Sequence, residues 1–216
     1  MNRRITDLIH KTLTAAFVLI AALGVVFGAK AAFGKTAIFK KAHTVNIKGQ
    51  IRDNINYWRE DVTKIAKTST RVNLVISSPG GSVYTGIMFV ENMKRLQSRG
   101  KKFYCVVDRL AMSMAFVILS VCDYRYILNS SLLLFHPSRM GMDGYVTAKS
   151  SKLTAKQLEM FDTYLDTLQR PVLKLSDKIY EMYGDNDMII TGYHMSKISP
   201  TFGVVIDDFK VLEGKK

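Results

Sequence analysis

Strand-like and helix-like segments alternate along most of this chain, and no other feature of the sequence restricts the fold as much. Apolar residues follow a strand pattern at 45–51 and 71–78, whereas they recur at helical spacing at 53–67 and 83–100. The connections between these segments are short, so successive strands can run parallel with the helices packed against the sheet. The sequence therefore predicts an α/β domain built around a parallel sheet.

The same alternation continues to the end of the chain. The pattern predicts a strand at 101–108, an apolar helix at 112–122, one or two strands within 124–137, and a last strand within 202–212.

A long helix is expected before the last strand. Thr154 and Gln157 match a capping box, and apolar residues from Leu158 to Met182 follow at steps of three and four. Pro171 should kink or interrupt this helix, because proline lacks the N–H that a helix needs. The apolar stripe fits two interpretations: the helix packs on its own domain, or it contacts another subunit.

The first 31 residues differ from the rest of the chain. Residues 12–29 carry no charge, and as a helix they would be about 27 Å long, close to the ~30 Å of a bilayer core. The segment fits a signal peptide cleaved after Ala31, an uncleaved membrane anchor or, least well, a buried helix. We expect residues 32–43 to be a linker and 44–216 to form the domain. We favour an exported or membrane-attached domain on the extracytoplasmic side, with a cytoplasm-facing anchored domain as the alternative.

Charge and cysteine content argue against several classes of protein. The net charge is +13, but no Lys/Arg run is interleaved with aromatic residues, so we expect no nucleic-acid partner. Cys105 and Cys122 are the only cysteines, and they lack both a CxxC spacing and neighbouring histidines, so we expect no metal site. Two buried thiols are the default expectation, and a disulfide is the alternative in an oxidising compartment.

The segment ISSPGGSV, residues 76–83, joins a predicted strand to a predicted helix. Gly80 and Gly81 leave backbone N–H groups uncovered just before the helix, and such groups suit an anion. The chain lacks GxxxxGK[ST] and GxGxxG, so no nucleotide or other cofactor is expected. The other candidate anion is the oxyanion that forms when a nucleophile attacks a carbonyl.

A nucleophile and a base are available at similar junctions. Ser113 follows a predicted strand at the start of a helix, where the N–H of Met114 is free to help hold an oxyanion. His136 ends another apolar strand and could take the proton of a serine hydroxyl. Taken singly, each residue is more often structural than catalytic, but their combination with the glycine turn favours catalysis.

The motifs LVISSPGGSVYTG, AMSMA and LLLFHP, in this order, resemble the proteolytic subunit of the Clp protease. The resemblance covers about residues 44–210 and is strongest over 72–137. It implies the fold of the ClpP/crotonase superfamily, with repeated strand-strand-helix units. It also implies a serine peptidase in which Ser113 is the nucleophile, His136 the general base, and the N–H groups of Gly81 and Met114 the oxyanion hole.

The resemblance also implies an acid that orients the histidine. In the family this residue follows the long helix and precedes a short helix and the last strand, and Asp187 occupies the matching place. Asp185 is the nearest alternative, and Asp207 and Asp208 are weaker ones.

Several departures from the family pattern leave other functions open. Arg109 stands near the place of a glycine that usually precedes the nucleophile, and HPS replaces the usual HQP. One alternative is an enzyme of the same fold that acts on an acyl thioester, as the enoyl-CoA hydratases do. Another is a serine–lysine peptidase using Lys152 or Lys156, and a third is a catalytically silent oligomeric scaffold.

The resemblance implies peptide or unfolded-protein substrates and a homo-oligomer. The sequence does not show whether an ATP-dependent unfoldase is a partner. Membrane contact is expected only through residues 12–29.

Overall fold

The computed structural model describes residues 39, 43–139, 147–184 and 187–213. The predicted membrane segment, its boundary at residue 31 and Asp185 lie outside these ranges. The chain divides into two compact units, Phe39–Phe209 and a second unit made of Met1–Ile38 and Lys210–Lys216. In the described ranges, no helix has both the length and the apolar character needed to cross a bilayer.

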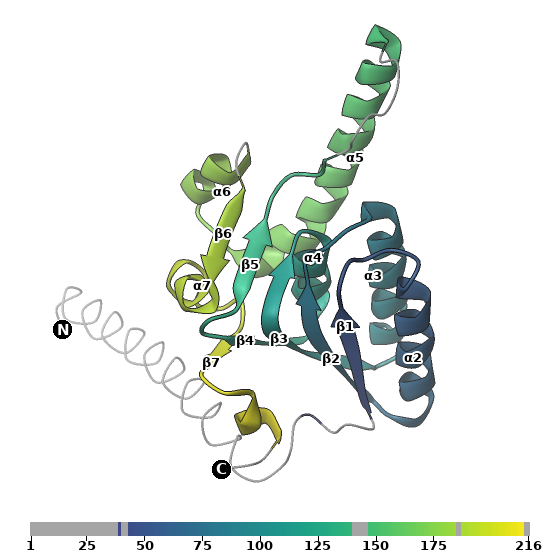
Figure 1. Cartoon of the computed structure of the whole chain (residues 1–216), viewed down its shortest axis with the longest axis vertical. Coiled ribbons are helices and arrows are strands. Elements are labelled where there is room, and N and C mark those ends of the chain that lie inside the picture. Colours follow the sequence, from purple (N-terminus) through teal and green to yellow (C-terminus); the bar gives the residue numbers. More distant parts are fainter. Residues whose placement is uncertain (1–38, 40–42, 140–146, 185–186, 214–216) are drawn as a thin grey trace, which may run out of the picture. The chain divides into compact units, whose positions relative to one another are not determined.

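A seven-stranded sheet forms the centre of the larger unit, as Figure 1 shows. Its order is β1-β2-β3-β4-β7, while β5 pairs with the end of β3, and β6 pairs with β5. Every pairing is parallel except β5–β6, so the predicted parallel sheet is confirmed. The antiparallel strand β6 was not expected from the sequence. The strands are β1 (Thr44–Lys48), β2 (Arg71–Ser78), β3 (Lys102–Met112), β4 (Tyr124–Leu128), β5 (Leu132–Phe135), β6 (Met188–Thr191) and β7 (Val204–Ile206).

Helices connect most of these strands. They are α2 (Ile55–Thr68), α3 (Val83–Gln97), α4 (Met114–Val121), α5 (Ala148–Leu173), α6 (Asp177–Gly184) and α7 (Gly192–Ile198), followed by the 3₁₀ helix η2 (Phe209–Glu213). Helix α4 packs against both α3 and α5 as well as the sheet. All its residues up to Ser120 are buried, which explains why its sequence is apolar on every side.

Helix α5 begins earlier than the sequence predicted. Its N-cap is Thr147, whose side chain accepts from the Ser150 N–H while the Ser150 side chain bonds back to Thr147. The predicted capping box at Thr154 was therefore wrong, because that residue lies inside the helix. The predicted interruption by Pro171 occurs slightly later: the helix ends at Leu173 and is followed by Lys174 in the left-handed region, at φ 47°.

The two parts of α5 have different surroundings. Leu165 and Leu173 are buried, and Leu168 and Val172 pack against the core. The first interpretation of the apolar stripe is thus confirmed for the second part of the helix. The first part extends away from the sheet (Figure 1), and Met160 on it is 65% exposed. Contact with another subunit remains a prediction for this part.

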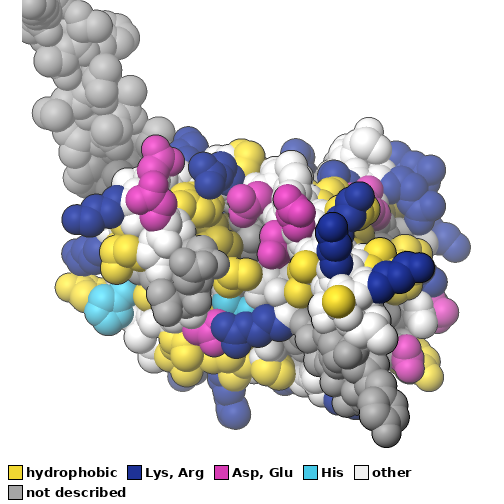
Figure 2. Space-filling model, turned by 90° about the horizontal axis from the view of Figure 1, so that it is seen from above, with side chains coloured by type: hydrophobic (Ala, Val, Ile, Leu, Met, Phe, Trp, Pro, Cys, Tyr) yellow, Lys and Arg dark blue, Asp and Glu magenta, His cyan; other side chains and the backbone are white. Residues whose placement is uncertain are grey.

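Charged side chains are unevenly arranged on the face shown in Figure 2. Lys and Arg side chains are spread over much of this face, in keeping with the net charge of +13. Asp and Glu side chains gather near its middle, next to hydrophobic side chains. An acidic region is therefore present on a strongly basic protein.

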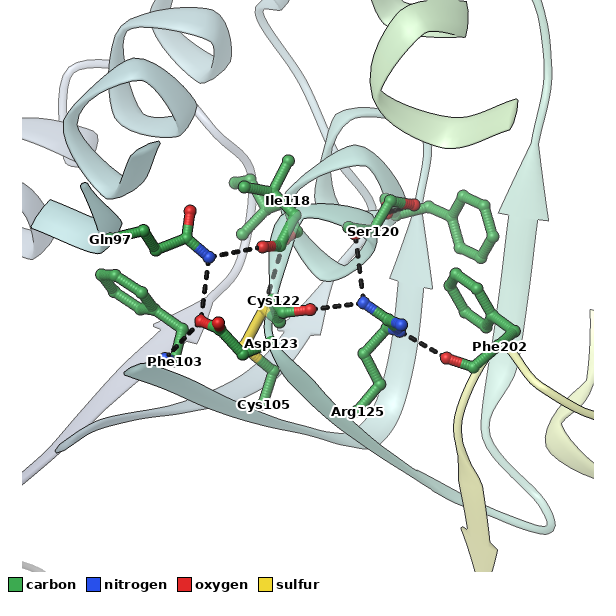
Figure 3. The surroundings of a disulfide bond; sticks show 11 residues. Gln97, Phe103, Cys105, Ile118, Ser120, Cys122, Asp123, Arg125 and Phe202 are labelled. Carbon is green, nitrogen blue, oxygen red and sulfur yellow. Dashed lines mark hydrogen bonds between the residues drawn. A yellow bond between two sulfur atoms is a disulfide. The ribbon is translucent and has the colours of Figure 1, made fainter. Parts of the chain in front are cut away.

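Cys105 and Cys122 form a disulfide rather than the two buried thiols expected from the sequence (Figure 3). The Cα atoms are 6.1 Å apart, and both residues are buried. The bond joins β3 to the residue after α4, so it closes the segment that carries Ser113. The sequence could not decide this pairing because it depends on how α4 folds back over β3.

Hydrogen bonds surround the disulfide (Figure 3). The side chain of Gln97 donates to the Val121 carbonyl and to Asp123, each at 2.9 Å. Asp123 also accepts from the Phe103 N–H at 3.0 Å. Arg125, on the other side, donates to the carbonyl oxygens of Ser120, Cys122 and Phe202. These bonds fix both ends of the closed segment.

Removing the disulfide should destabilise the domain. The double variant Cys105→Ala/Cys122→Ala is expected to lose about 3 kcal/mol of unfolding free energy, because the unfolded chain is no longer constrained. Urea unfolding of the full chain measures this loss. Reduced wild type serves as the control and should unfold at the same urea concentration as the double variant. Equal midpoints for oxidised and reduced wild type would contradict the prediction.

Candidate active site

Three of the predicted motifs meet because three neighbouring strands end at one edge of the sheet. β2 and β5 lie on opposite sides of β3, with Ser78 opposite Ala111 and Met112 opposite Leu134. Since all three strands are parallel, the segments that follow them emerge together. The register therefore brings the glycine turn, Ser113 and His136 to the same place.

Ser113 lies in an unusual backbone conformation between β3 and α4. Its φ is 53° and its ψ is −125°, and positive φ is rare outside glycine. Its N–H donates to the Leu134 carbonyl at 2.9 Å, and its own carbonyl accepts from the Phe116 N–H at 2.9 Å. Such a conformation costs on the order of 1–3 kcal/mol, and residues of this kind cluster at active sites.

The glycine turn lies against Ser113 and Ile51. A Cβ on Gly80, whose φ is 88°, would be 2.7 Å from the Ser113 Cβ. The Ile51 N–H donates to the Gly80 carbonyl at 2.8 Å, and the Ser82 N–H donates to the Ile51 carbonyl at 3.0 Å. A Cβ on Gly81 would be 2.3 Å from that Ile51 oxygen. Both positions therefore require glycine for steric reasons.

Two backbone donors lie beside Ser113. Gly81 and Met114 line the same pocket as Ser113, and neither N–H donates to another residue in the described ranges. Met114 is the first residue of α4, where a helix leaves its N–H groups without internal partners. Together the two N–H groups can hold an oxyanion.

The pocket has a volume of about 510 Å³ and combines apolar and charged side chains. Val83, Met114, Val117, Phe135 and Leu165 contribute the apolar part. No three His, Cys, Asp or Glu side chains lie close enough to hold a metal ion in the part of the chain that the structure describes. Helices α5 and α6 also contribute acidic and aromatic side chains to this pocket. The sequence did not lead us to expect them, because only the apolar stripe of these helices was considered. The polar residues between the stripe positions were the available signal: Asp162, Asp166, Asp177, Tyr180 and Glu181.

His136 also lines this pocket, directly after β5. Its Nδ1 lies 2.5 Å from the Pro137 carbonyl oxygen. With its hydrogen on Nδ1, the ring donates to that oxygen and leaves Nε2 as an acceptor. A neutral imidazole with a free Nε2 is the form that can take a proton from a serine hydroxyl.

Asp187 has a different partner from the one that the sequence predicted. Its carboxylate forms an ion pair with Arg139, and it is not among the residues that line the pocket. No hydrogen bond joins Asp187 to His136, although both residues lie in the described ranges. The structure thus brings Ser113, His136, Gly81 and Met114 to one pocket, whereas the predicted acid lies beside Arg139.

The other candidates also lie apart from the pocket. Lys152 and Lys156 are exposed on the first part of α5 and do not line it. Asp207 accepts a hydrogen bond from Asn129 near the end of β7. The arrangement therefore favours His136 over either lysine as the base next to Ser113.

The comparison with known families agrees with this geometry. The family model described as Clp protease matches residues 31–192, well over half of the chain. The match includes the glycine turn, Ser113, His136 and Asp187. A search of curated proteins finds no significant match. On the evidence of the matched region, the chain belongs to the Clp protease family.

Proposed function

We propose that this protein is a serine peptidase with Ser113 as its nucleophile. The observation that carries the proposal is the strained Ser113 at a strand–helix junction. It shares one pocket with His136 and with two N–H groups that have no partner among the described residues. A structural serine at a helix N-terminus has no need of positive φ, nor of glycines that allow a backbone turn to approach it closely.

In this mechanism Ser113 Oγ attacks the carbonyl carbon of a peptide bond while His136 Nε2 accepts the hydroxyl proton. The carbonyl oxygen becomes an oxyanion, held by the N–H groups of Gly81 and Met114. His136 then gives the proton to the leaving amine, which produces an acyl-enzyme. Water, activated by His136, hydrolyses the acyl-enzyme and restores Ser113.

Asp187 is proposed as the acid that orients His136. In this role its carboxylate would exchange Arg139 for the Nδ1–H of His136, and the Pro137 carbonyl would lose that hydrogen bond. The ion pair with Arg139 keeps the Asp187 carboxylate next to the segment that follows His136.

The proposed peptidase function also leads to proposals for the substrate, the oligomeric state and the cellular location of the protein. Clp protease family members act on peptides and form oligomers, so we expect a peptide or unfolded-protein substrate and a homo-oligomer. The buried disulfide supports an oxidising compartment and hence an exported or membrane-anchored domain on the extracytoplasmic side.

A fluorophosphonate probe tests the nucleophile directly, since it reacts only with activated serines. The purified full chain should be labelled, and Ser113→Ala should not be labelled. Ser120→Ala is the matched control, because Ser120 is buried on α4 and bonded to the Phe116 carbonyl. This variant should keep the label. Labelling that survives in Ser113→Ala would show that another serine is the activated one. An unlabelled oligomeric wild type would instead favour a thioester enzyme or a silent scaffold.

A further inference from the structure

The active-site pocket carries more negative charge than the proposed reaction uses. Its lining includes four carboxylates but only two guanidinium groups, in a chain whose net charge is +13. Figure 2 shows acidic side chains gathered near the middle of the face, next to hydrophobic ones. The charged residues of the lining are Asp162, Asp166, Asp177, Glu181, Arg139 and Arg170.

Both guanidinium groups are already paired. Arg139 forms its ion pair with Asp187, which lies outside the lining. Arg170 lies 4.0 Å from an Asp166 oxygen and 3.8 Å from an Asp177 oxygen. One guanidinium thus faces two carboxylates, and the other is bound to a carboxylate that the pocket does not contain.

Two carboxylates of the lining remain without a basic partner among the described residues. Asp162 accepts only the neutral N–H of Ser138, at 2.7 Å, and Glu181 has no ion pair. Burial raises the pKa of Asp166, Arg170 opposes this shift, and Asp162 adds to it. Asp162 and Asp166 are therefore close enough to repel one another, and a cation placed between them would relieve this repulsion.

Tyr180 gives independent evidence for a ligand. The residue is 8% exposed, and its buried hydroxyl has no hydrogen-bond partner in the described part of the chain. Its ring is fixed between Phe135, at a centroid distance of 5.9 Å, and the guanidinium of Arg170, at 4.3 Å. Burial and the charge of Asp166 raise the pKa of Tyr180 to about 12. The hydroxyl is thus neutral at pH 7, lies near Asp166, and can accept a hydrogen bond.

We propose that this pocket binds a lysine or arginine side chain of the substrate, on a residue next to the cleaved bond. The inference rests on the proposed peptidase function. The apolar lining, which includes Val117 and Leu165, would contact the methylene groups of such a side chain. Its cationic end would reach Asp162 and Asp166 and donate to the Tyr180 hydroxyl. A neutral or acidic side chain would leave these groups unpaired.

Three sets of peptides test the preference. Each set varies one position: the second residue before the cleaved bond, the first residue before it, or the first residue after it. At that position the three peptides of a set carry lysine, its uncharged analogue norleucine, or glutamate. With the wild-type full chain, kcat/KM for lysine should exceed that for norleucine by about tenfold at one position, and glutamate should be the poorest. Equal turnover of all three peptides at every position would overturn the inference and leave the peptidase proposal intact.

Two variants test whether the preference for lysine over norleucine comes from this pocket. Asp162→Asn removes the charge but keeps an oxygen for the Ser138 N–H, and Tyr180→Phe removes the hydroxyl but keeps the ring. Each should lower the lysine-to-norleucine ratio of kcat/KM severalfold, because each removes a group that the proposed pocket offers to the cationic end of the lysine. Glu159→Gln is the control, because Glu159 is exposed on the same helix outside the pocket, and it should leave the ratio unchanged. An unchanged ratio in both pocket variants would overturn the inference.

A binding measurement separates this inference from the proposed chemistry. Ser113→Ala should still bind the lysine peptide about tenfold more tightly than the norleucine peptide, as measured by fluorescence anisotropy. If wild type is neither labelled nor active while this binding preference is present, the peptidase proposal fails and the basic-side-chain pocket stands. Equal binding of both peptides would contradict the pocket.

Discussion

Replacing His136 by alanine is expected to lower kcat for peptide hydrolysis by about 10⁴–10⁶-fold, because Ser113 then has no group to accept its proton. His136 lines the pocket together with Ser113, and in the tautomer that donates from Nδ1 to the Pro137 carbonyl its Nε2 can accept a proton. KM should change little, since the imidazole acts mainly in the transition state. Steady-state hydrolysis of the best lysine peptide measures both constants, and the fluorophosphonate label should be lost in parallel.

The matched control is His194→Ala. His194 is exposed on α7, where its Nδ1 is 2.8 Å from the Thr191 hydroxyl, and it does not line the pocket. Its replacement should leave kcat unchanged. If His136→Ala kept most of the wild-type kcat, another residue would have to be the base, and the serine–lysine alternative would regain weight.

The sequence could predict the meeting of Ser113 with His136 because parallel strands impose it. Each residue follows a strand directly, and the carboxyl ends of adjacent parallel strands share an edge. The pairing of Met112 with Leu134 leaves Ser113 and His136 as near neighbours at that edge. Local order along the chain thus carried most of the information about the positions of Ser113, His136 and the glycine turn.

Contacts between distant segments could not be predicted in this way. The ion pair of Asp187 with Arg139 joins residues 48 positions apart, and it depends on where the segment after His136 meets the start of β6. The acidic lining likewise depends on how α5 and α6 turn after Leu173. A helical pattern shows which residues share a face, but it does not show which pocket that face closes.

The disulfide shows the same limit. Its two cysteines are 17 positions apart, in a strand and after a helix, and they do not have the spacing of a CxxC motif. Only the packing of α4 over β3 brings their Cα atoms to 6.1 Å.

Gly80→Ala should both inactivate and destabilise the protein. The added Cβ would lie 2.5 Å from the Met112 carbonyl oxygen and 2.7 Å from the Ser113 Cβ, so the strained turn at Ser113 must move. A displacement of about 1 Å at a nucleophile can lower the rate about 10²-fold. The left-handed φ of 88° and the overpacking together should remove about 2–5 kcal/mol of unfolding free energy. Peptide hydrolysis and urea unfolding of the full chain measure the two effects.

The variant Gly100→Ala separates two causes of the expected loss in Gly80→Ala: the clash of the added Cβ with its neighbours, and the left-handed backbone conformation that an alanine adopts at a cost. Gly100 has nearly the same conformation, at φ 80°, but a Cβ there would meet no atom within 4 Å. This variant should lose about 1 kcal/mol of stability and keep its kcat/KM, because only the backbone preference changes. If Gly80→Ala behaved like Gly100→Ala in both assays, the close approach of the glycine turn to Ser113 would have no catalytic importance. If Gly80→Ala loses activity and Gly100→Ala does not, the close approach of Gly80 to Ser113 is needed to place Ser113 for reaction.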